Sequence, residues 1–210
     1  MPKQEAPIGY LDRYLPPGTL EPVTRYLQEY KVHLTITRER KSILGDYRHR
    51  THHANHRISI NSTLNKYAFL ITLLHELGHL LTFEKFGNRV QAHGKEWKMI
   101  FGGLLQQFVS NKIFPGDIEK ELLLSLHNPA AGSCAEDGLL RVLRKYDAKE
   151  SHHRLVEEIP FQSLFRCSDG RIFKKGKKLR KRFKCLELKS GKEYLFSPVF
   201  EVESVENYEL

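Results

Sequence analysis

The sequence predicts an α+β fold, in which helices pack on a short sheet and a small antiparallel β-module follows. Two observations lead to this prediction. Apolar residues recur at helical spacing as far as about residue 146, and from Pro160 the pattern changes to short alternating strands bounded by turn residues. The polar stretch 147–154 between the two patterns is typical of a linker. We therefore expect two domains, residues 1–155 and residues 156–210.

The first domain should contain helices and two strands. Alternation of apolar and polar residues predicts strands at 32–37 and 57–61, separated by a polar tract at 46–56 that is rich in His and Arg. A leucine-rich helix is expected at 64–83. It should be buried, because its apolar residues cover most of its circumference. Asn61 or Ser62 is expected to cap it and Gly87 to follow it. The expected helices are residues 18–29, 64–83, 94–109, 115–126 and, from capping-box spacing at 133–136, a last one reaching about residue 146.

The second domain should be a β-module with short strands at 163–166, 171–173 and 182–185. Asp169-Gly170 and Ser190-Gly191 supply hairpin turns. The net charge of +9 is concentrated here. Between Gly170 and Lys192 the chain has eleven basic residues and one acidic residue, whereas the rest of the chain nets −1.

A basic segment of this density favours a polyanionic partner, because phosphates would neutralise its self-repulsion. We expect it to bind DNA, including single-stranded DNA, through the backbone and without base recognition. A solvated face of a hairpin is the plain alternative. The residues expected to bind nucleic acid are Lys174, Lys175, Lys177, Lys178, Arg180, Lys181, Arg182 and Lys184.

Other features bear on where the protein works. The longest apolar stretch, 67–74, is far short of the roughly 20 residues that span a bilayer, and the N-terminus lacks the apolar segment of a secretory signal. Three cysteines are too few for a disulfide scaffold and suit a reducing compartment. The expectation is a cytoplasmic protein without a membrane partner, associated with the nucleoid if it binds DNA.

The leucine-rich helix contains the motif His75-Glu76-Leu77-Gly78-His79. Residues four apart lie on the same face of a helix, so both imidazoles can reach one metal ion. Glu76 can address a water on that ion without being a ligand. A chance match, or a pair of histidines satisfied within the core, is the alternative interpretation. Buried polar groups need partners, however, and this favours the metal site.

A catalytic zinc site needs a third protein ligand and an open fourth position. His93 is the best candidate, because it lies past Gly87, where the chain can turn back, and directly before the next helix. Glu76 would then act as general base toward a zinc-acidified water and pass its proton to a leaving amine. No oxyanion donor is evident, and Tyr47, His53 and Arg57 are candidates with more plausible structural roles. Alternatives to His93 as the third ligand are Glu84, Glu96, His52, His53 and His56.

The motif at 75–79, followed by His93-Gly94-Lys95-Glu96-Trp97, resembles the SprT-like metalloprotease family. The strand at 58–61, leading into the motif helix, resembles that family as well. The resemblance spans roughly residues 20–109. It implies a zincin-like helical domain that holds one Zn²⁺ through His75, His79 and His93, with Glu76 as general base. The related Spartan proteases cut proteins crosslinked to DNA, which implies a protein substrate.

The sequence departs from the family near its C-terminus, where many members have a zinc ribbon with two CxxC pairs. Here Cys167 and Cys185 each lack the second cysteine. Two thiolates cannot close a tetrahedral zinc site, so we expect a degenerate, ribbon-like β-module without zinc, in which the cysteines are small buried residues.

These inferences combine into one functional hypothesis: a zinc peptidase recruited to DNA that hydrolyses DNA-bound or DNA-crosslinked proteins. The alternative is a non-catalytic nucleic-acid-binding accessory protein with a structural or vestigial zinc site. A general metallopeptidase with an incidental basic patch is a third, weaker hypothesis. A fourth coordination position open to water would separate the first hypothesis from the second.

Overall fold

The structure, a computed structural model, describes residues 8–40, 43–147 and 153–205. The chain divides into two compact units, Met1–Asp147 and Ala148–Leu210, a few residues before the expected boundary at 155/156. Most of the expected linker, 148–152, lies outside the described residues. The first unit combines helices with a sheet and the second is built on an antiparallel sheet, which confirms the predicted α+β class.

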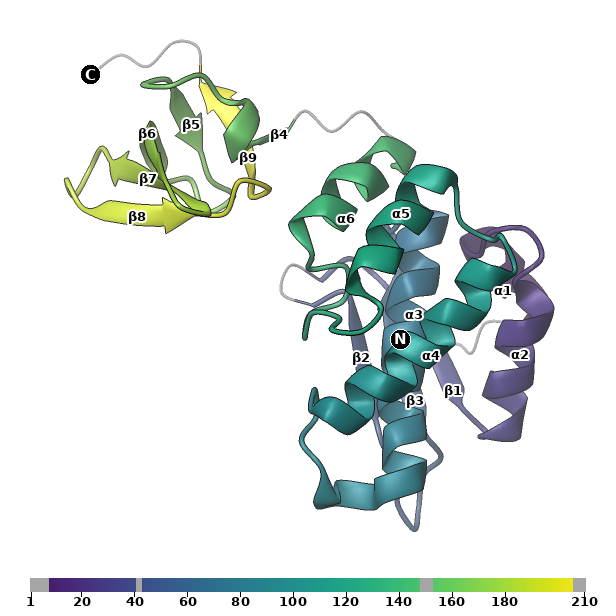
Figure 1. The fold of residues 1–210 in the computed structure, drawn as a ribbon. Coiled ribbons are helices and arrows are strands. Elements are labelled where there is room, and N and C mark those ends of the chain that lie inside the picture. Colours follow the sequence, from purple (N-terminus) through teal and green to yellow (C-terminus); the bar gives the residue numbers. More distant parts are fainter. Residues whose placement is uncertain (1–7, 41–42, 148–152, 206–210) are drawn as a thin grey trace. The chain divides into compact units, whose positions relative to one another are not determined.

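The first unit contains a three-stranded sheet with helices packed against it (Figure 1). Its central helix is α3, which contacts β2 and β3 on one side and α4 on the other. The strands are β1 (His33–Thr37), β2 (Gly45–Arg48) and β3 (Arg57–Asn61). The helices are α1 (Ile8–Leu11), α2 (Leu20–Glu29), α3 (Lys66–Phe86), α4 (Lys95–Ser110), α5 (Gly116–Ser125) and α6 (Asp137–Leu143).

Strand β2 lies where the sequence predicts no strand. It pairs antiparallel with β3, with Tyr47 opposite Ile58, while β1 pairs parallel on the other side of β3, with Leu34 opposite Ile58. Gly45 and Asp46 have low strand propensity, but pairing with β3 and packing on α3 override it. The order β1-β3-β2 makes β2 an edge strand, so its half-exposed side chains need no apolar alternation.

Helix α3 begins later than expected. Asn65 is its N-cap, because the Asn65 side chain accepts hydrogen bonds from the backbone N–H groups of Tyr67 (3.1 Å) and Ala68 (2.9 Å). The predicted caps, Asn61 and Ser62, were wrong. The two candidates lie at and just beyond the end of β3, and a short turn separates them from the helix.

The body of α3 is buried nearly all round, as its leucine content predicts. Leu70, Leu73, Leu74 and Leu77 are fully buried in the core of the unit. The helix runs three residues beyond the expected end and stops at Gly87, whose φ of +62° suits a residue without a Cβ.

The predicted capping box at 133–136 does not start a helix. Helix α6 begins at Asp137, and the carboxylate of Glu136 accepts a hydrogen bond from the backbone N–H of Ala130 at 2.8 Å. Cys134 has a φ of +55°, which is outside the right-handed helical region. Residues 127–136 therefore form a structured loop between α5 and α6.

The second unit is a six-stranded antiparallel sheet in the described residues, with strand order β4-β9-β5-β6-β7-β8. Phe165, Phe173, Val156 and Val202 form its fully buried core. Its strands are β4 (Arg154–Leu155), β5 (Leu164–Arg166), β6 (Ile172–Leu179), β7 (Arg182–Glu187), β8 (Glu193–Phe196) and β9 (Glu201–Val205).

Strand β6 is much longer than the predicted 171–173, because its lysine-rich half pairs with β7 despite the charge.

Within the described parts of the chain, none of the helices combines the length and the hydropathy that crossing a bilayer requires.

Candidate metal centre

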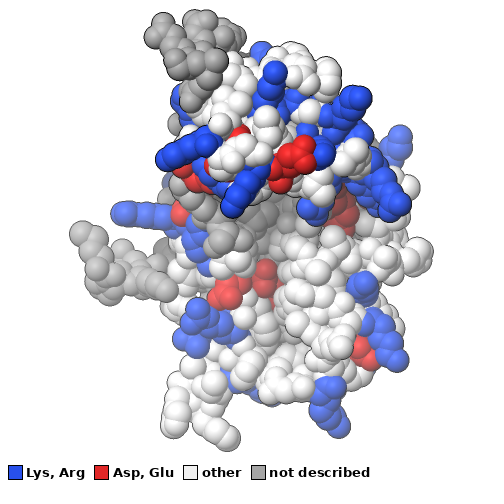
Figure 2. Space-filling view, turned by 90° about the vertical axis from the view of Figure 1, so that its left-hand side faces the viewer, with Lys and Arg blue, Asp and Glu red and all other residues white. Residues whose placement is uncertain are grey.

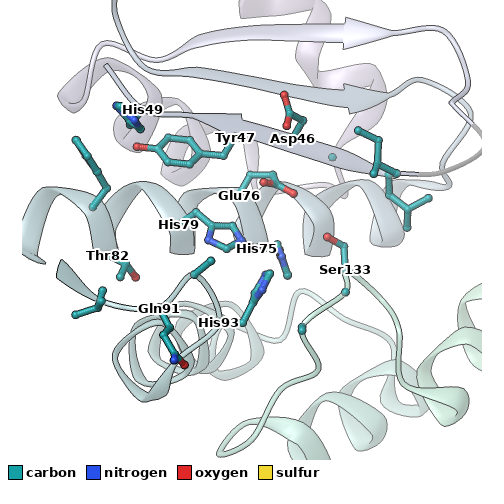
Figure 3. Close-up of a pocket in the computed structure, with 18 of the residues that line it drawn as sticks. Asp46, Tyr47, His49, His75, Glu76, His79, Thr82, Gln91, His93 and Ser133 are labelled. Atoms are coloured by element: carbon teal, nitrogen blue, oxygen red, sulfur yellow. Dashed lines mark hydrogen bonds between the residues drawn. The ribbon is translucent and has the colours of Figure 1, made fainter. Parts of the chain in front are cut away.

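Three histidines from two separate segments meet beside α3 (Figure 3). His75 and His79 lie one turn apart on α3, and their Nε2 atoms are 3.3 Å apart. His93 comes from the loop before α4, and its ring centroid lies 5.4 Å from that of His75 and 4.6 Å from that of His79. One nitrogen of each ring lies within 4.8 Å of the others, a spacing that a single metal ion can bridge.

Close packing of α4 on α3 brings His93 to the pair. A Cβ at Gly78 would lie 3.1 Å from Cβ of Phe101 and 3.2 Å from Nε1 of Trp97, so a side chain there would push α4 away. The Trp97 ring stands against the imidazoles, with centroid distances of 4.7 Å to His75 and 4.8 Å to His93. The glycine inside the motif thus has a packing role.

The electrostatics of the three imidazoles suit a cation. Burial lowers the pKa of His75 to about 3 and that of His79 to about 4, and it also lowers the pKa of His93. All three are therefore neutral at neutral pH, the form that donates a lone pair to a metal. Nδ1 of His75 and Nε2 of His93 are buried without a hydrogen-bond partner. A bound metal ion would give Nε2 of His93 a partner, and a set of imidazole ligands fits zinc.

Glu76 lies next to this group on α3, with its carboxylate directed into the same pocket (Figure 3). Its side chain is buried, and burial, assisted by the nearby carboxylate of Asp46, raises the pKa of Glu76 to about 8. A carboxyl group with a pKa near neutrality can both accept and release a proton. The geometry thus places an acid–base group beside the candidate ligands.

The pocket has a volume of about 650 Å³. Residues 43–47, which include most of β2, form one wall, α3 forms the floor, and residues 87–88, 90–93 and 131–133 close the other sides. Gly45, Asp46 and Ser133 also line this pocket, although no sequence motif marks them as functional. Gly45 directly precedes the polar tract at 46–56, Asp46 begins it, and Ser133 begins the predicted capping box, so no periodic pattern marks any of the three.

The alternative third ligands lie elsewhere. His56 is buried, its Nε2 lies 3.2 Å from Glu84, and its Nδ1 lies 2.9 Å from the hydroxyl of Tyr47. His52 and His53 are exposed. Glu96 lies 3.9 Å from the ammonium of Lys95 and is not part of the three-histidine group.

The candidate oxyanion donors from the sequence do not point at the site. The Tyr47 phenol lines the pocket, but its hydroxyl points away from the three histidines (Figure 3) and hydrogen-bonds His56. Because the carboxylate of Glu84 lies at Nε2 of His56, Nδ1 is the acceptor and the Tyr47 hydroxyl donates to it. His53 and Arg57 are exposed and do not line the pocket.

Most of the basic residues of the second unit are on its surface, and Figure 2 shows Lys and Arg side chains crowded at the top of the view, where this unit lies. Lys174 and Lys184 are half-buried, and Lys184 pairs with Glu193 at 2.7 Å. A second group lies at the turn between β6 and β7 and is exposed. We name it the hairpin tip, and it consists of Lys177, Lys178, Arg180, Lys181 and Arg182.

Lys175 corrects the expectation from the sequence. It is only 5% exposed, and its ammonium donates hydrogen bonds to the carbonyl oxygens of Glu157 (3.0 Å) and Ile159 and lies over the ring of Phe183. Burial lowers the pKa of Lys175. This ammonium holds the module together and does not face a surface that nucleic acid can reach.

Cys167 and Cys185 are buried free thiols in the second unit. Burial raises the pKa of Cys167 to about 11 and also raises that of Cys185, so both stay protonated near neutral pH. This burial matches the structural role expected for them.

Comparison with known proteins agrees with the motif. Residues 20–113 match the SprT-like family. Protein SprT of Pseudomonas putida is 46% identical over 35 residues, and Protein SprT of Pseudomonas entomophila is 43% identical over 35 residues. Each match covers 17% of this chain and 21% of the relative, so the chain spans about a fifth of the length of these curated relatives. No solved structure matches the chain. Residues 20–113, which include the three histidines and Glu76, are therefore similar to the SprT-like family, which is associated with metallopeptidase-like function.

Proposed function

We propose that this protein is a zinc-dependent peptidase that is recruited to DNA and hydrolyses DNA-bound or DNA-crosslinked proteins. The observation that carries the proposal is the group of three neutral imidazoles beside Glu76 in an open pocket. Among the described residues, no fourth histidine, cysteine or carboxylate completes the group. An open fourth position is what distinguishes catalytic from structural zinc sites.

The chain's own residues divide the work of hydrolysis. His75, His79 and His93 would hold the ion, which when bound supplies an acidified water and polarises a carbonyl group. Glu76 accepts the proton of the attacking water and delivers it to the nitrogen of the departing amine. Its raised pKa suits this exchange, because the same group must act first as a base and then as an acid.

A peptide is the substrate class that the pocket wall favours. Residues 43–47 line the pocket consecutively, so it is the edge of β2, and not one face of the strand, that borders the cavity. This edge has no partner strand among the described residues. An extended peptide can pair with such an edge through main-chain hydrogen bonds, which would lay its backbone across the site.

The charge of the second unit supports recruitment to DNA. The hairpin tip presents five exposed cations, and neutralising them with phosphates would release counterions. The alternative function, a non-catalytic nucleic-acid-binding protein, keeps this feature and lacks hydrolysis. The two differ in whether the Glu76 carboxylate is needed for any activity.

The decisive experiment compares the wild type with Glu76→Gln, and with the exposed Glu21→Gln as a matched control. Cleavage of a DNA-binding protein is measured with and without DNA. We expect Glu76→Gln to lower the rate by a factor on the order of 10² to 10⁴ with zinc content unchanged. Equal cleavage by wild type and Glu76→Gln would refute the mechanism, and cleavage indifferent to DNA would refute the recruitment.

A further inference from the structure

Ser133 occupies the pocket wall that faces β2. It belongs to the loop between α5 and α6, and Ala131 and Gly132 line the pocket beside it. Figure 3 shows the Ser133 hydroxyl pointing into the pocket, toward Glu76. This loop lies beyond residue 113, where the match to the SprT-like family ends. A segment outside the matched region therefore completes the pocket.

The Ser133 hydroxyl makes no hydrogen bond with any described residue, and in this it differs from most polar groups around it. Gln91 extends away from the three histidines (Figure 3), and Asn88 lies beyond the C-terminal end of α3. The other neutral donors of the pocket are engaged: the Tyr47 hydroxyl with His56, the His49 Nδ1 with the carbonyl oxygen of Arg50, and the Thr82 hydroxyl with the carbonyl oxygen of Gly78.

The neighbouring residue anchors Ser133 to the helix that carries the site. Cys134 is buried, and its Sγ lies 3.9 Å from the carbonyl oxygen of Ala68 and 4.0 Å from the hydroxyl of Thr72, both on α3. Thr72 lies one helical turn before Glu76. The position of Ser133 relative to Glu76 is thus fixed by packing, which is the preorganisation that a catalytic donor requires.

We propose that the Ser133 hydroxyl donates a hydrogen bond to the carbonyl oxygen of the scissile peptide bond. This inference rests on the proposed peptidase function. When the water oxygen adds to the carbonyl carbon, the electron pair of the C=O double bond moves to its oxygen, which becomes negatively charged. The hydroxyl stabilises this charge without giving up its proton. Ser133 thereby supplies the donor that Tyr47, His53 and Arg57 do not provide.

The test uses the full zinc-loaded chain with Ser133→Ala and Ser133→Thr. We expect Ser133→Ala to lower kcat roughly 100-fold, with KM changed less than about threefold, because the bond strengthens only as charge develops. Ser133→Thr keeps the hydroxyl and should retain most of the activity. Binding of a phosphinic peptide, whose anionic oxygens mimic the tetrahedral intermediate, should weaken by a similar factor in Ser133→Ala. Zinc content and Tm should match the wild type.

Each outcome separates this inference from the function on which it rests. If the wild type cleaves, Glu76→Gln does not, and Ser133→Ala cleaves at the wild-type rate, the role of Ser133 is wrong and the peptidase stands. A shifted pH profile in Ser133→Ala, with phosphinate affinity unchanged, would assign Ser133 to orienting Glu76 and overturn the proposed contact. If the wild type is no more active than Glu76→Gln, the peptidase proposal itself fails and this inference fails with it.

Discussion

Gly45 and Glu76 are in such close contact that no side chain fits between them. A Cβ at Gly45 would lie 2.6 Å from Oε1 of Glu76 and 2.7 Å from Cγ2 of Thr72. Strand β2 thus presses its backbone against the α3 face that carries the acid–base group. The missing side chain leaves room for the Glu76 carboxylate in the orientation that the structure shows.

Gly45→Ala should displace Glu76. Overpacking of this kind costs about 1–3 kcal/mol of folding free energy, and the flexible carboxylate is the group that can yield. We expect peptidase turnover to fall at least roughly tenfold, since proton transfer depends on position, while zinc content stays unchanged because the three imidazoles keep their places. Turnover of purified Gly45→Ala and its metal content are the measurements.

Gly103→Ala is the matched control for this variant. Gly103 is exposed on α4, and a Cβ there would meet nothing within 4 Å. The substitution should leave turnover unchanged and stabilise the helix by about 0.5–1 kcal/mol. A Gly45→Ala protein as active as Gly103→Ala would show that Glu76 tolerates the new methyl group.

The pH dependence of stability in the metal-free protein should be set in part by Glu76. Its pKa is about 8 in the folded chain and 4.5 in the reference state, so between these values the folded chain holds a proton that the unfolded chain has released. Stability therefore falls as the pH rises through this range. For His75 and His79 the shift is opposite, from 6.5 down to about 3 and 4, so stability also falls as the pH drops below 6.5.

These opposing trends predict a stability maximum near pH 6.5 for the metal-free wild type. In Glu76→Gln the loss of stability between about pH 6.5 and pH 8 should be smaller than in the wild type, while the loss of stability below pH 6.5 remains. Tm measured from pH 5 to pH 9 on both metal-free proteins tests this. An equal fall in Tm between about pH 6.5 and pH 8 in the two proteins would contradict the raised pKa of Glu76.

Removing His93 should weaken zinc binding strongly. A catalytic site with three protein ligands loses a third of its ligand set in His93→Ala, so the loss should exceed the 10- to 100-fold that accompanies removal of an outer hydrogen-bond partner of a ligand. His53→Ala is the control, because His53 is exposed and outside the group. Zinc affinity by competitive titration distinguishes the two, and equal affinities would remove His93 from the site.

Lys175 and Lys177 should respond oppositely to mutation although they are two residues apart. Lys177→Ala removes an exposed charge, and the log–log salt slope of DNA affinity should decrease in magnitude by about 1. Lys175→Met should leave that slope unchanged and destabilise the second unit by about 1–3 kcal/mol, since a buried and a part-buried carbonyl oxygen lose their donor. Fluorescence titrations at several salt concentrations and urea unfolding measure the two effects.

Much of the fold was predictable because it depends on local pattern. The leucine-rich helix at 66–86 and the two strands around 33–37 and 57–61 follow from apolar spacing alone. Strand β2 was missed, because an edge strand that contains Gly45 and Asp46 has no periodic signal and exists through its pairing with β3. The loop at 133–136 resembles a capping box in sequence, but the burial of Cys134 against α3 determines its conformation.

The amino-acid sequence by itself determined that His75 and His79 are neighbours with Glu76 beside them, because spacing along a helix is local geometry. Only the tertiary structure decided what surrounds them. Three features depend on contacts between residues far apart in the chain: the close contact of Gly45 with Glu76, the position of Ser133 in the pocket wall, and the position of His56 outside the three-histidine group. The same holds for Lys175, whose ammonium is buried against the carbonyl oxygens of Glu157 and Ile159, more than fifteen residues earlier in the chain. Such contacts are decided by packing of the whole unit, and no short stretch of sequence records them.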